Sequence, residues 1–403
     1  MRQTDVEKAR ARERNLRWME ALWEGTSTSA KEEDLPRSTT HDASPAVSGR
    51  YAVLERGDTT RSQWNAWTEG SPGGGHLLQS YEWGEIKRAL KWRPVRLVLQ
   101  REDEVVGVGQ FVTYSTPLVP GVLMYCPKGP WLPWEDEEAV RTFFRGLLDV
   151  AIRHRAHTIK IEPEVTEDST RTKELLAEIG FKKFRWNVNH KMTTTVDLEL
   201  PEDELLANMK KGTRYGVRRA IREGVKVVED NSPGARDVFW RMHGEMVDRK
   251  NFWSRPHSYY SVVWKAMEDA GRSHLFFAEH EGDRLAAALF YTFGRKCIYM
   301  LGTSKKEKRE LQPAYALQWE AMRWAKQRGI TRYDMWGISK LDKPYKDHPL
   351  YGVSKFKAGF GGGIENFLGC LDLPVSRVRA RAWDGVEPLY FRAYQRLKGD
   401  VYY

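Results

Sequence analysis

Cysteine is scarce in this sequence, and its few cysteines lie far apart. Cys126, Cys297 and Cys370 are the only three among 403 residues. Their spacing excludes a CxxC metal pair and does not suggest a disulfide framework. We therefore expect three small buried thiols and no metal site.

Long apolar runs are also missing. No run approaches the roughly 18 residues that a membrane-spanning helix needs. The opening stretch, MRQTDVEKARARERN, lacks the apolar centre of a signal peptide. We expect a cytoplasmic protein, with peripheral contact at the inner face of the membrane left open as an alternative.

Positive charge is in excess, with 65 Lys and Arg against 55 Asp and Glu. Residues 1–50 hold nine residues of each sign, so the excess belongs to the rest of the chain. A basic surface suits a polyanion, a phosphorylated substrate or an anionic membrane, although many basic proteins are merely soluble. No helix-turn-helix, zinc-finger or RRM signature is present, which argues against DNA as a partner.

The chain divides into a tail and two similar halves. Residues 1–25 suit one charged helix, and the polar residues 26–49 suit a disordered linker. Each half then shows two hairpin strands, a third strand, a helix and a further strand. In the first half these are 94–100, 104–114, 121–127, 135–154 and 158–163; in the second they are 275–280, 284–293, 297–304, 313–328 and 332–337.

This repeated order predicts an α/β protein with mixed sheets. It resembles two tandem GNAT-like acyltransferase domains, which we place at 51–197 and 198–367, with 368–403 completing the first. An acetyl-CoA enzyme needs a glycine-rich turn whose amides hold the pyrophosphate. The turn at 304–317 has no glycine, and the corresponding stretch at 131–140 is acidic. We therefore expect no coenzyme A and no other cofactor.

A strongly basic segment lies between the two halves. Residues 205–226 contain seven basic residues and one acid. Arg214, Arg218 and Arg222 are four apart, which puts them on one face of a helix, with Arg219 turned about 100° away. Guanidinium groups bind phosphate bidentately. Phosphate binding is our interpretation, and a solvated helix is the alternative.

The stretch LYGVSKFKAGFGGG, at 350–363, joins an aromatic–lysine step to a glycine run. Glycine lets a backbone approach a ligand closely, and a lysine there can face a developing negative charge. The alternative is a strand and turn with a solvated lysine. A helix at 81–90, with Ser80 as N-cap, places Lys87 at the edge of an apolar stripe.

Taken together, these stretches resemble the FemABX family of peptidoglycan-bridge aminoacyltransferases, in its short form without a helical arm. The matching segments span nearly all of 76–370 and are 77–92, 125–131, 210–224, 276–304, 311–338 and 350–364. The resemblance implies transfer of an amino acid from aminoacyl-tRNA to the stem-peptide amine of a UDP-linked or lipid-linked muropeptide.

The resemblance also implies roles for particular residues. Lys87 and Arg219 resemble the residues that hold the muropeptide diphosphate, and we add Arg218 and Arg222 to that substrate-binding set. Glu162 falls where some relatives have Asp before Pro. Tyr299 matches a tyrosine of the substrate channel, with core packing as the alternative, while a second tyrosine of some relatives is Leu301 here.

Phe356 and Lys357 resemble the catalytic pair near the aminoacyl ester. Lys357 would face the oxyanion of the tetrahedral intermediate, and Phe356 would offer a stacking face to the terminal base of the tRNA. Three rival functions remain open at this point: a tRNA-dependent transferase with an acceptor outside the cell wall, a non-catalytic RNA-binding protein, and an ordinary acetyl-CoA transferase.

Overall fold

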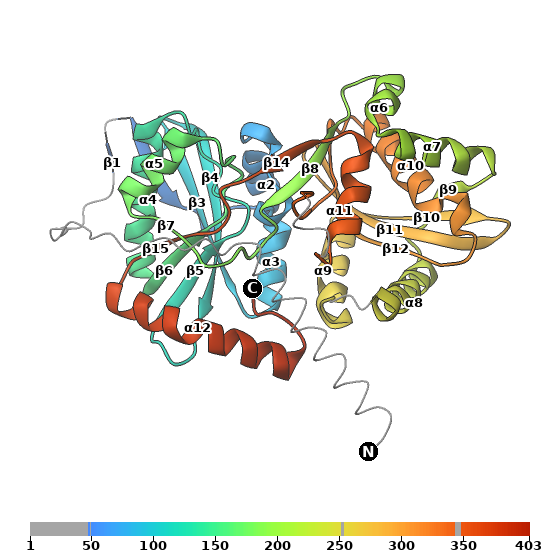
Figure 1. Ribbon diagram of the computed structural model, residues 1–403. Helices are drawn as coiled ribbons and strands as arrows, with labels where there is room; N and C mark the ends of the chain where they lie inside the picture. The colour runs from blue at the N-terminus through green and yellow to red at the C-terminus, as the bar shows by residue number, and fades with distance from the viewer. Residues whose placement is uncertain (1–46, 49, 251–253, 343–347) are drawn as a thin grey trace, which may run out of the picture. The chain divides into compact units, whose positions relative to one another are not determined.

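The computed structural model describes residues 47–48, 50–250, 254–342 and 348–403. Two compact units divide this chain (Figure 1). The first unit runs to Asn189 and takes in Phe367–Tyr403, and the second unit is His190–Asn366. The helix predicted in 1–25 and nearly all of the linker predicted at 26–49 lie outside the described residues.

The first unit is built on an eight-stranded mixed sheet with the strand order β1-β2-β3-β4-β5-β6-β15-β7. Its neighbouring strands are antiparallel except for β5 and β6, which are parallel. The strands are β1 (Val47–Ser48), β2 (Tyr51–Glu55), β3 (Arg93–Arg101), β4 (Glu104–Ser115), β5 (Val122–Cys126), β6 (Ala156–Ile161), β7 (Lys182–Lys183) and β15 (Leu371–Pro374).

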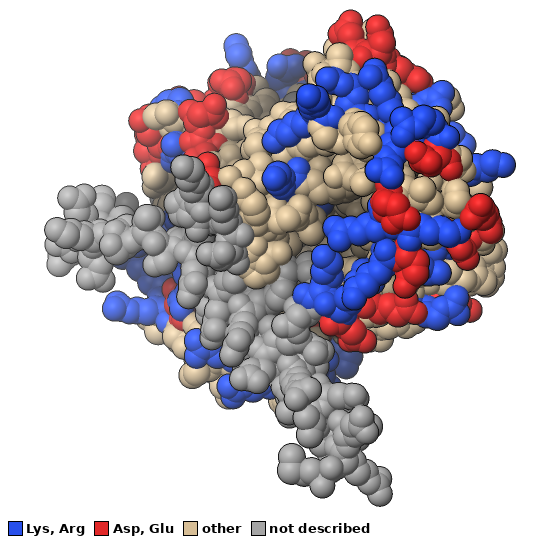
Figure 2. Space-filling model, turned by 45° about the vertical axis from the view of Figure 1, so that its right-hand side comes forward, with Lys and Arg blue, Asp and Glu red and all other residues tan. Residues whose placement is uncertain are grey.

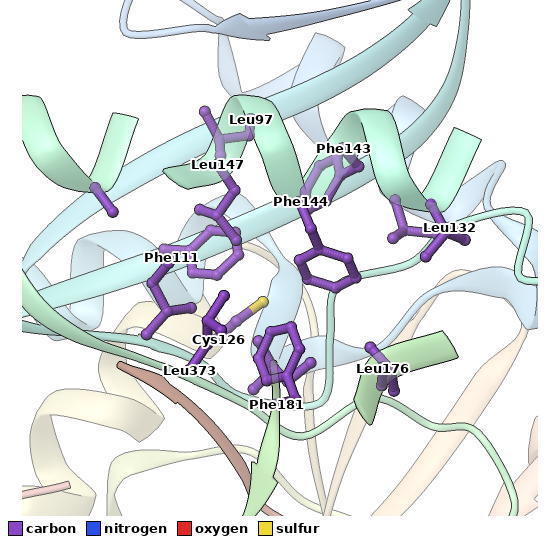
Figure 3. Packing of buried hydrophobic residues seen from close by; sticks show 14 of the residues in the cluster. Leu97, Phe111, Cys126, Leu132, Phe143, Phe144, Leu147, Leu176, Phe181 and Leu373 are labelled. Carbon is purple, nitrogen blue, oxygen red and sulfur yellow. The ribbon is translucent and has the colours of Figure 1, made fainter. Parts of the chain in front are cut away.

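Helices cover both faces of this sheet because its central strands alternate their buried side chains between two cores. Met124 and Cys126 of β5 pack in the core that α4 covers, seen in Figure 3, whereas Leu123 and Tyr125 pack in the core that α12 covers. The helices are α2 (Arg61–Glu69), α3 (Tyr81–Ala89), α4 (Glu137–Arg153), α5 (Thr170–Ile179) and α12 (Arg377–Lys398), with short 3-10 turns at Pro72–Gly74 and Leu77–Gln79. The predicted cap of α3 is confirmed, because the Ser80 hydroxyl accepts a hydrogen bond from the Trp83 amide at 3.1 Å.

The second unit has a seven-stranded mixed sheet in the order β14-β8-β13-β12-β11-β10-β9. Here β12 and β13 are the parallel pair. The strands are β8 (Met192–Asp197), β9 (Lys226–Glu229), β10 (Ser273–His280), β11 (Asp283–Phe293), β12 (Lys296–Ser304), β13 (Arg332–Asp334) and β14 (Gly363–Asn366). The helices are α6 (Glu202–Asn208), α7 (Lys211–Arg222), α8 (Pro233–Lys250), α9 (His257–Asp269), α10 (Pro313–Gln327) and α11 (Tyr351–Lys357), with 3-10 turns at Arg309–Leu311 and Ala358–Phe360.

The predicted fold class is confirmed in these two mixed α/β sheets. The order of hairpin, strand, helix and parallel strand appears as β3, β4, β5, α4, β6 and again as β10, β11, β12, α10, β13. The strand β8 pairs with β13 and β14, so its hydrogen bonds lie in the second sheet. The units therefore divide after Asn189, whereas the predicted domain boundary follows Asp197.

Cys126, Cys297 and Cys370 are buried and free, as predicted. Among the described residues, no helix combines the length and the apolar character that crossing a bilayer requires.

Candidate functional site

Lys357 is the last residue of α11 and lies inside the second unit. Its side chain is only 7% exposed. The Nζ atom donates a hydrogen bond to the Gly337 carbonyl at 3.0 Å and lies 5.5 Å from the centre of the Tyr299 ring. The alternative of a strand and turn with a solvated lysine is therefore wrong, because residues 351–357 form a helix that carries the ammonium group inward.

Burial changes the acidity of this lysine. Removal from water lowers the pKa of Lys357 from 10.5 to about 8, and the negative charge of Asp334 partly opposes that fall. With a pKa near 8, the protonated form still exceeds the neutral form by about ten to one at pH 7. The site therefore holds a poorly hydrated cation, whose interaction with a negative charge is stronger than it would be in water.

The carbonyl that holds Lys357 is positioned by the residues that follow β13. An Asp334 carboxylate oxygen accepts a hydrogen bond from the Trp336 amide at 2.8 Å, and Trp336 has a φ of 59°. At Gly337 a Cβ atom would lie 2.0 Å from the His190 ring. Only glycine fits between that ring and Lys357, so the tight turn after β13 presents its carbonyl to the ammonium group.

Tyr299 is placed beside Lys357 by an irregularity in β12. The β11–β12 register shifts between Leu289 and Phe290, and such bulges turn side chains to new directions. The Tyr299 hydroxyl lies over Gly302, where a Cβ atom would come within 1.8 Å of it. Burial raises the pKa of Tyr299 to about 12, so the phenol is neutral. Its ring also lies 5.6 Å from Phe290, which means that it packs on the core as well as facing Lys357.

The glycine run after Lys357 packs against protein rather than forming an open loop. A Cβ atom on Gly359 would lie 2.3 Å from the Thr213 hydroxyl, and one on Gly361 would lie 2.7 Å from the Asn208 carbonyl. The Gly359 carbonyl also accepts a hydrogen bond from the Lys210 amide at 2.9 Å. These close approaches bring the Lys357 stretch against the start of the basic helix α7, although about 150 residues separate them in the sequence.

Phe356 is half-buried next to this junction. Its ring meets those of Tyr315 and Phe360 edge to face, each at 5.1 Å between ring centres. Two aromatic neighbours thus fix the direction of the ring, while part of it stays exposed.

The arginines of α7 differ in what they contact. Arg218 and Arg222 are exposed, and Arg222 pairs with Glu223 at 3.0 Å. Arg214 instead turns back and donates to the Ala207 carbonyl at 2.8 Å, which closes the end of α6. Arg219 is half-buried, and its Nε atom finds no hydrogen-bond partner among the residues that the structure describes. Figure 2 brings this side of the molecule forward and shows lysine and arginine side chains gathered there, with some acidic groups among them.

Lys87 and Glu162 belong to the first unit, and both are buried. The Lys87 ammonium group lies between two indole rings, 5.3 Å from that of Trp83 and 5.4 Å from that of Trp92. Glu162 accepts hydrogen bonds from the Tyr125 hydroxyl at 2.5 Å and from the Asn189 amide at 2.9 Å. The carboxylate is thus already bound by protein donors, and its role toward a substrate stays a prediction.

Several groups around Lys357 were not evident from the sequence. They are the buried Asp334 carboxylate, the Gly337 carbonyl and the half-buried His190 ring. Two of these residues lie in the stretch RYDMWG, which reads only as a strand. In the first unit, Lys128 follows β5, and its Nζ atom lies 3.9 Å from a Glu164 carboxylate oxygen. Lys128 lies in the stretch YCPKGPW, which carried part of the family resemblance. That resemblance is the signal by which Lys128 could have been found from the sequence. No cluster of His, Cys, Asp and Glu able to hold a metal occurs within the described ranges.

The chain folds into two tandem α/β units. The second unit encloses a buried lysine beside a basic helix. The model of the FemAB family matches residues 59–281 and 273–387 of this chain. These matches cover most of the sequence, and the chain belongs to that family.

Relatives with assigned functions are similar over nearly their whole length. The lipid II:glycine glycyltransferase of Staphylococcus epidermidis (strain ATCC 12228) is 23% identical over 419 residues, which cover 86% of this chain and 100% of the relative. The protein with the same description from Staphylococcus aureus (strain USA300) is 24% identical, over 84% of this chain and 97% of its own length. The crystal structure of FemX shares this fold, with a TM-score of 0.75 and 22% identity over 83% of this chain and 99% of that one.

Proposed function

We propose that this protein transfers an amino acid from aminoacyl-tRNA to the stem-peptide amine of a peptidoglycan precursor. Membership of the FemAB family and the description of two relatives as lipid II:glycine glycyltransferases support the transferase part of the proposal. The single observation that carries the chemistry is Lys357, a buried ammonium group held by the Gly337 carbonyl within reach of Tyr299.

The reaction needs an amine to attack an ester. The acceptor nitrogen bonds to the ester carbonyl carbon, and the carbonyl oxygen takes the negative charge of a tetrahedral intermediate. The Lys357 ammonium group faces that oxygen and stabilises it. The bond between the carbonyl carbon and the ribose oxygen then breaks, and the proton lost by the amine ends on the departing ribose hydroxyl. No acyl-enzyme is required.

We infer the acyl donor from two features, the positive charge of α7 and the turn that precedes α10. Arg218 and Arg222 extend into solvent from α7, whose first turn contacts the Lys357 stretch. A basic surface of this kind suits a phosphate backbone, and its binding should weaken steeply with salt. The turn that would hold the pyrophosphate of coenzyme A leads into Pro313, which has no N–H. This supports tRNA, and no coenzyme A, as the source of the acyl group.

Arg219 is the residue that we assign to the acceptor diphosphate. Within the described part of the chain its Nε atom lacks a hydrogen-bond partner, so a phosphate oxygen there would remove the cost of an unsatisfied buried donor. Replacing Arg219 with Ala should raise the KM for the muropeptide roughly tenfold with little change in kcat. The matched variant Arg145→Ala, at an exposed position of α4, should leave both constants unchanged. An unaltered KM in Arg219→Ala would contradict the assignment.

The decisive experiment combines the purified protein with a mixed aminoacyl-tRNA pool and a muropeptide, either UDP-linked or lipid-linked, and reads the product by mass spectrometry. We expect the acceptor mass to rise by one aminoacyl residue, and the increment identifies the amino acid. Ribonuclease treatment of the pool should abolish the product. Transfer from acetyl-CoA, or tRNA binding without any transfer, would refute the proposal.

A further inference from the structure

The last helix of the chain, α12, lies along one side of the first unit (Figure 1) and has two different faces. One face is buried on the sheet through Trp383 and Phe391, which pack with Tyr402 in an aromatic core. Glu387 points the same way and accepts a hydrogen bond from the Tyr402 hydroxyl at 2.5 Å. This face is therefore fully used in holding the helix to the unit.

The opposite face exposes large apolar side chains. Val378 is 82% exposed and Leu389 is 65% exposed. They are eleven residues apart, which at 3.6 residues per turn puts them within about 20° of each other around the helix. Leu397 is also exposed, although it lies about 80° from Leu389 around the helix. Single exposed apolar residues are ordinary, but two large ones on one helix face indicate an interaction surface.

Basic side chains accompany this apolar row. The exposed basic residues of α12 are Arg377, Arg381, Arg392, Arg396 and Lys398. The helix has two acids, and neither belongs to the exposed face. Glu387 is buried, and Asp384 is half-buried. Of the basic residues, Arg381, Arg392 and Arg396 lie within about 80° of Val378 and Leu389 around the helix, so the outward face of α12 combines apolar and positive groups without negative charge.

The helix stays continuous through Pro388, which lies in its middle. Proline has no N–H, so the carbonyl four residues earlier, that of Asp384, loses its partner within the helix. The Arg185 guanidinium group replaces that partner and donates to the Asp384 carbonyl at 2.8 Å. The apolar residues on both sides of the proline therefore belong to one helix.

A neighbouring loop extends the surface at the start of the helix. Arg379 donates a hydrogen bond to the Pro120 carbonyl at 3.4 Å, which ties the loop of residues 116–121 to the first turn of α12. Within that loop Leu118 is 87% exposed, more than any other large apolar residue described. We call Leu118 and the outward face of α12 together the α12 surface.

We propose that the α12 surface docks on an anionic phospholipid bilayer. Helices with an apolar row flanked by Lys and Arg lie in the plane of the interface, with the apolar groups among the acyl chains and the cations at the headgroups. A nucleic acid would use the cations but has no need of Val378, Leu389 and Leu118. The inference extends the proposed function by bringing the enzyme to the surface where a lipid-linked acceptor resides. Its test does not depend on transfer activity.

The test is sedimentation of the full chain with vesicles of phosphatidylcholine, with or without phosphatidylglycerol. We expect binding to the anionic vesicles only, and weaker binding at high salt. The double variant Arg381→Glu, Arg396→Glu should bind at least roughly tenfold more weakly. The matched double variant Arg145→Glu, Lys173→Glu makes the same change in net charge as the α12 variant, but at exposed positions of α4 and α5. It should bind the vesicles as the wild type does.

The apolar contribution is tested at Leu389. Leu389→Ser should lower vesicle affinity roughly tenfold, whereas Leu389→Met, which keeps an apolar side chain, should retain it. Because Leu389 is exposed, both variants should keep the melting temperature of the wild type. The proposal is overturned if the wild type ignores anionic vesicles, if both charge variants lose binding equally, or if Leu389→Ser binds normally.

Discussion

Replacing Lys357 with Met should inactivate the enzyme and at the same time stabilise its fold. Burial lowers the pKa of this lysine from 10.5 to about 8. At about 1.4 kcal/mol for each tenfold change in proton affinity, the buried charge costs the folded state roughly 3 kcal/mol at neutral pH. Methionine removes that cost but leaves the Gly337 carbonyl without its donor, a loss of about 1–3 kcal/mol.

The net stabilisation is therefore about 0–2 kcal/mol, or a rise in melting temperature of up to about 8 °C for a unit of this size. The pH dependence gives a second readout. Between about pH 8 and 10.5 the unfolded chain binds more protons at Lys357 than the folded chain does. Wild-type stability should therefore rise with pH across that window, and Lys357→Met should lack this rise.

Transfer should fall at the same time, because the oxyanion loses its fixed cation. A contribution of about 3–4 kcal/mol corresponds to a 10²–10³-fold loss in kcat. The matched control is Lys355→Met, an exposed lysine on the same helix, which should change neither stability nor rate. Near-normal turnover of Lys357→Met would refute the catalytic role. An inactive variant that melts well below the wild type would instead show that Lys357 holds the fold.

Three further predictions concern the surroundings of the site and the core. Gly337→Ala should lower transfer and stability because its Cβ atom would meet the His190 ring at 2.0 Å, and adding His190→Ala should restore both; failure of that rescue would contradict the steric account. Glu162→Gln should lower the free energy of unfolding by about 1–3 kcal/mol in denaturant titrations. The reason is that the NH2 group of Gln replaces one carboxylate oxygen and cannot accept the hydrogen bonds that this oxygen accepts. Burial lowers the pKa of His243 from 6.5 to about 4, so the unfolded chain binds more protons between these values and stability should fall as pH drops from 6.5 to 4; His243→Phe should reduce that fall, and an unchanged profile would contradict it.

Much of the local structure follows from the sequence because its signals are local. The Ser80 cap, the apolar stripe of α3 and the alternating strands of both sheets depend on residues within one element. The repeated order of elements was also visible, because each element is marked by its own periodicity. The helix α11 was not predicted as a helix. The segment YGVSKFK is short and adjoins a glycine run, a pattern typical of a turn.

The candidate site was likewise only partly evident from the sequence. The types of residue at 356–357 and at 214–222 were evident, and so was their resemblance to one family. Their surroundings were not, because Lys357 is bound by a carbonyl twenty residues earlier and Gly359 packs on Thr213. Nor could the sequence distinguish Arg214, which closes α6, from Arg218, which extends into solvent.

By itself the sequence indicated the strands and helices of the repeated order, that they occur in two similar sets, and which family they resemble. Those properties depend on neighbouring residues and on ordered motifs. Only the tertiary structure decided that Lys357 is buried, that β8 pairs within the second sheet and that Leu389 faces outward. Burial and strand pairing depend on contacts between residues far apart in the chain, and no local pattern specifies which distant residue will provide the contact.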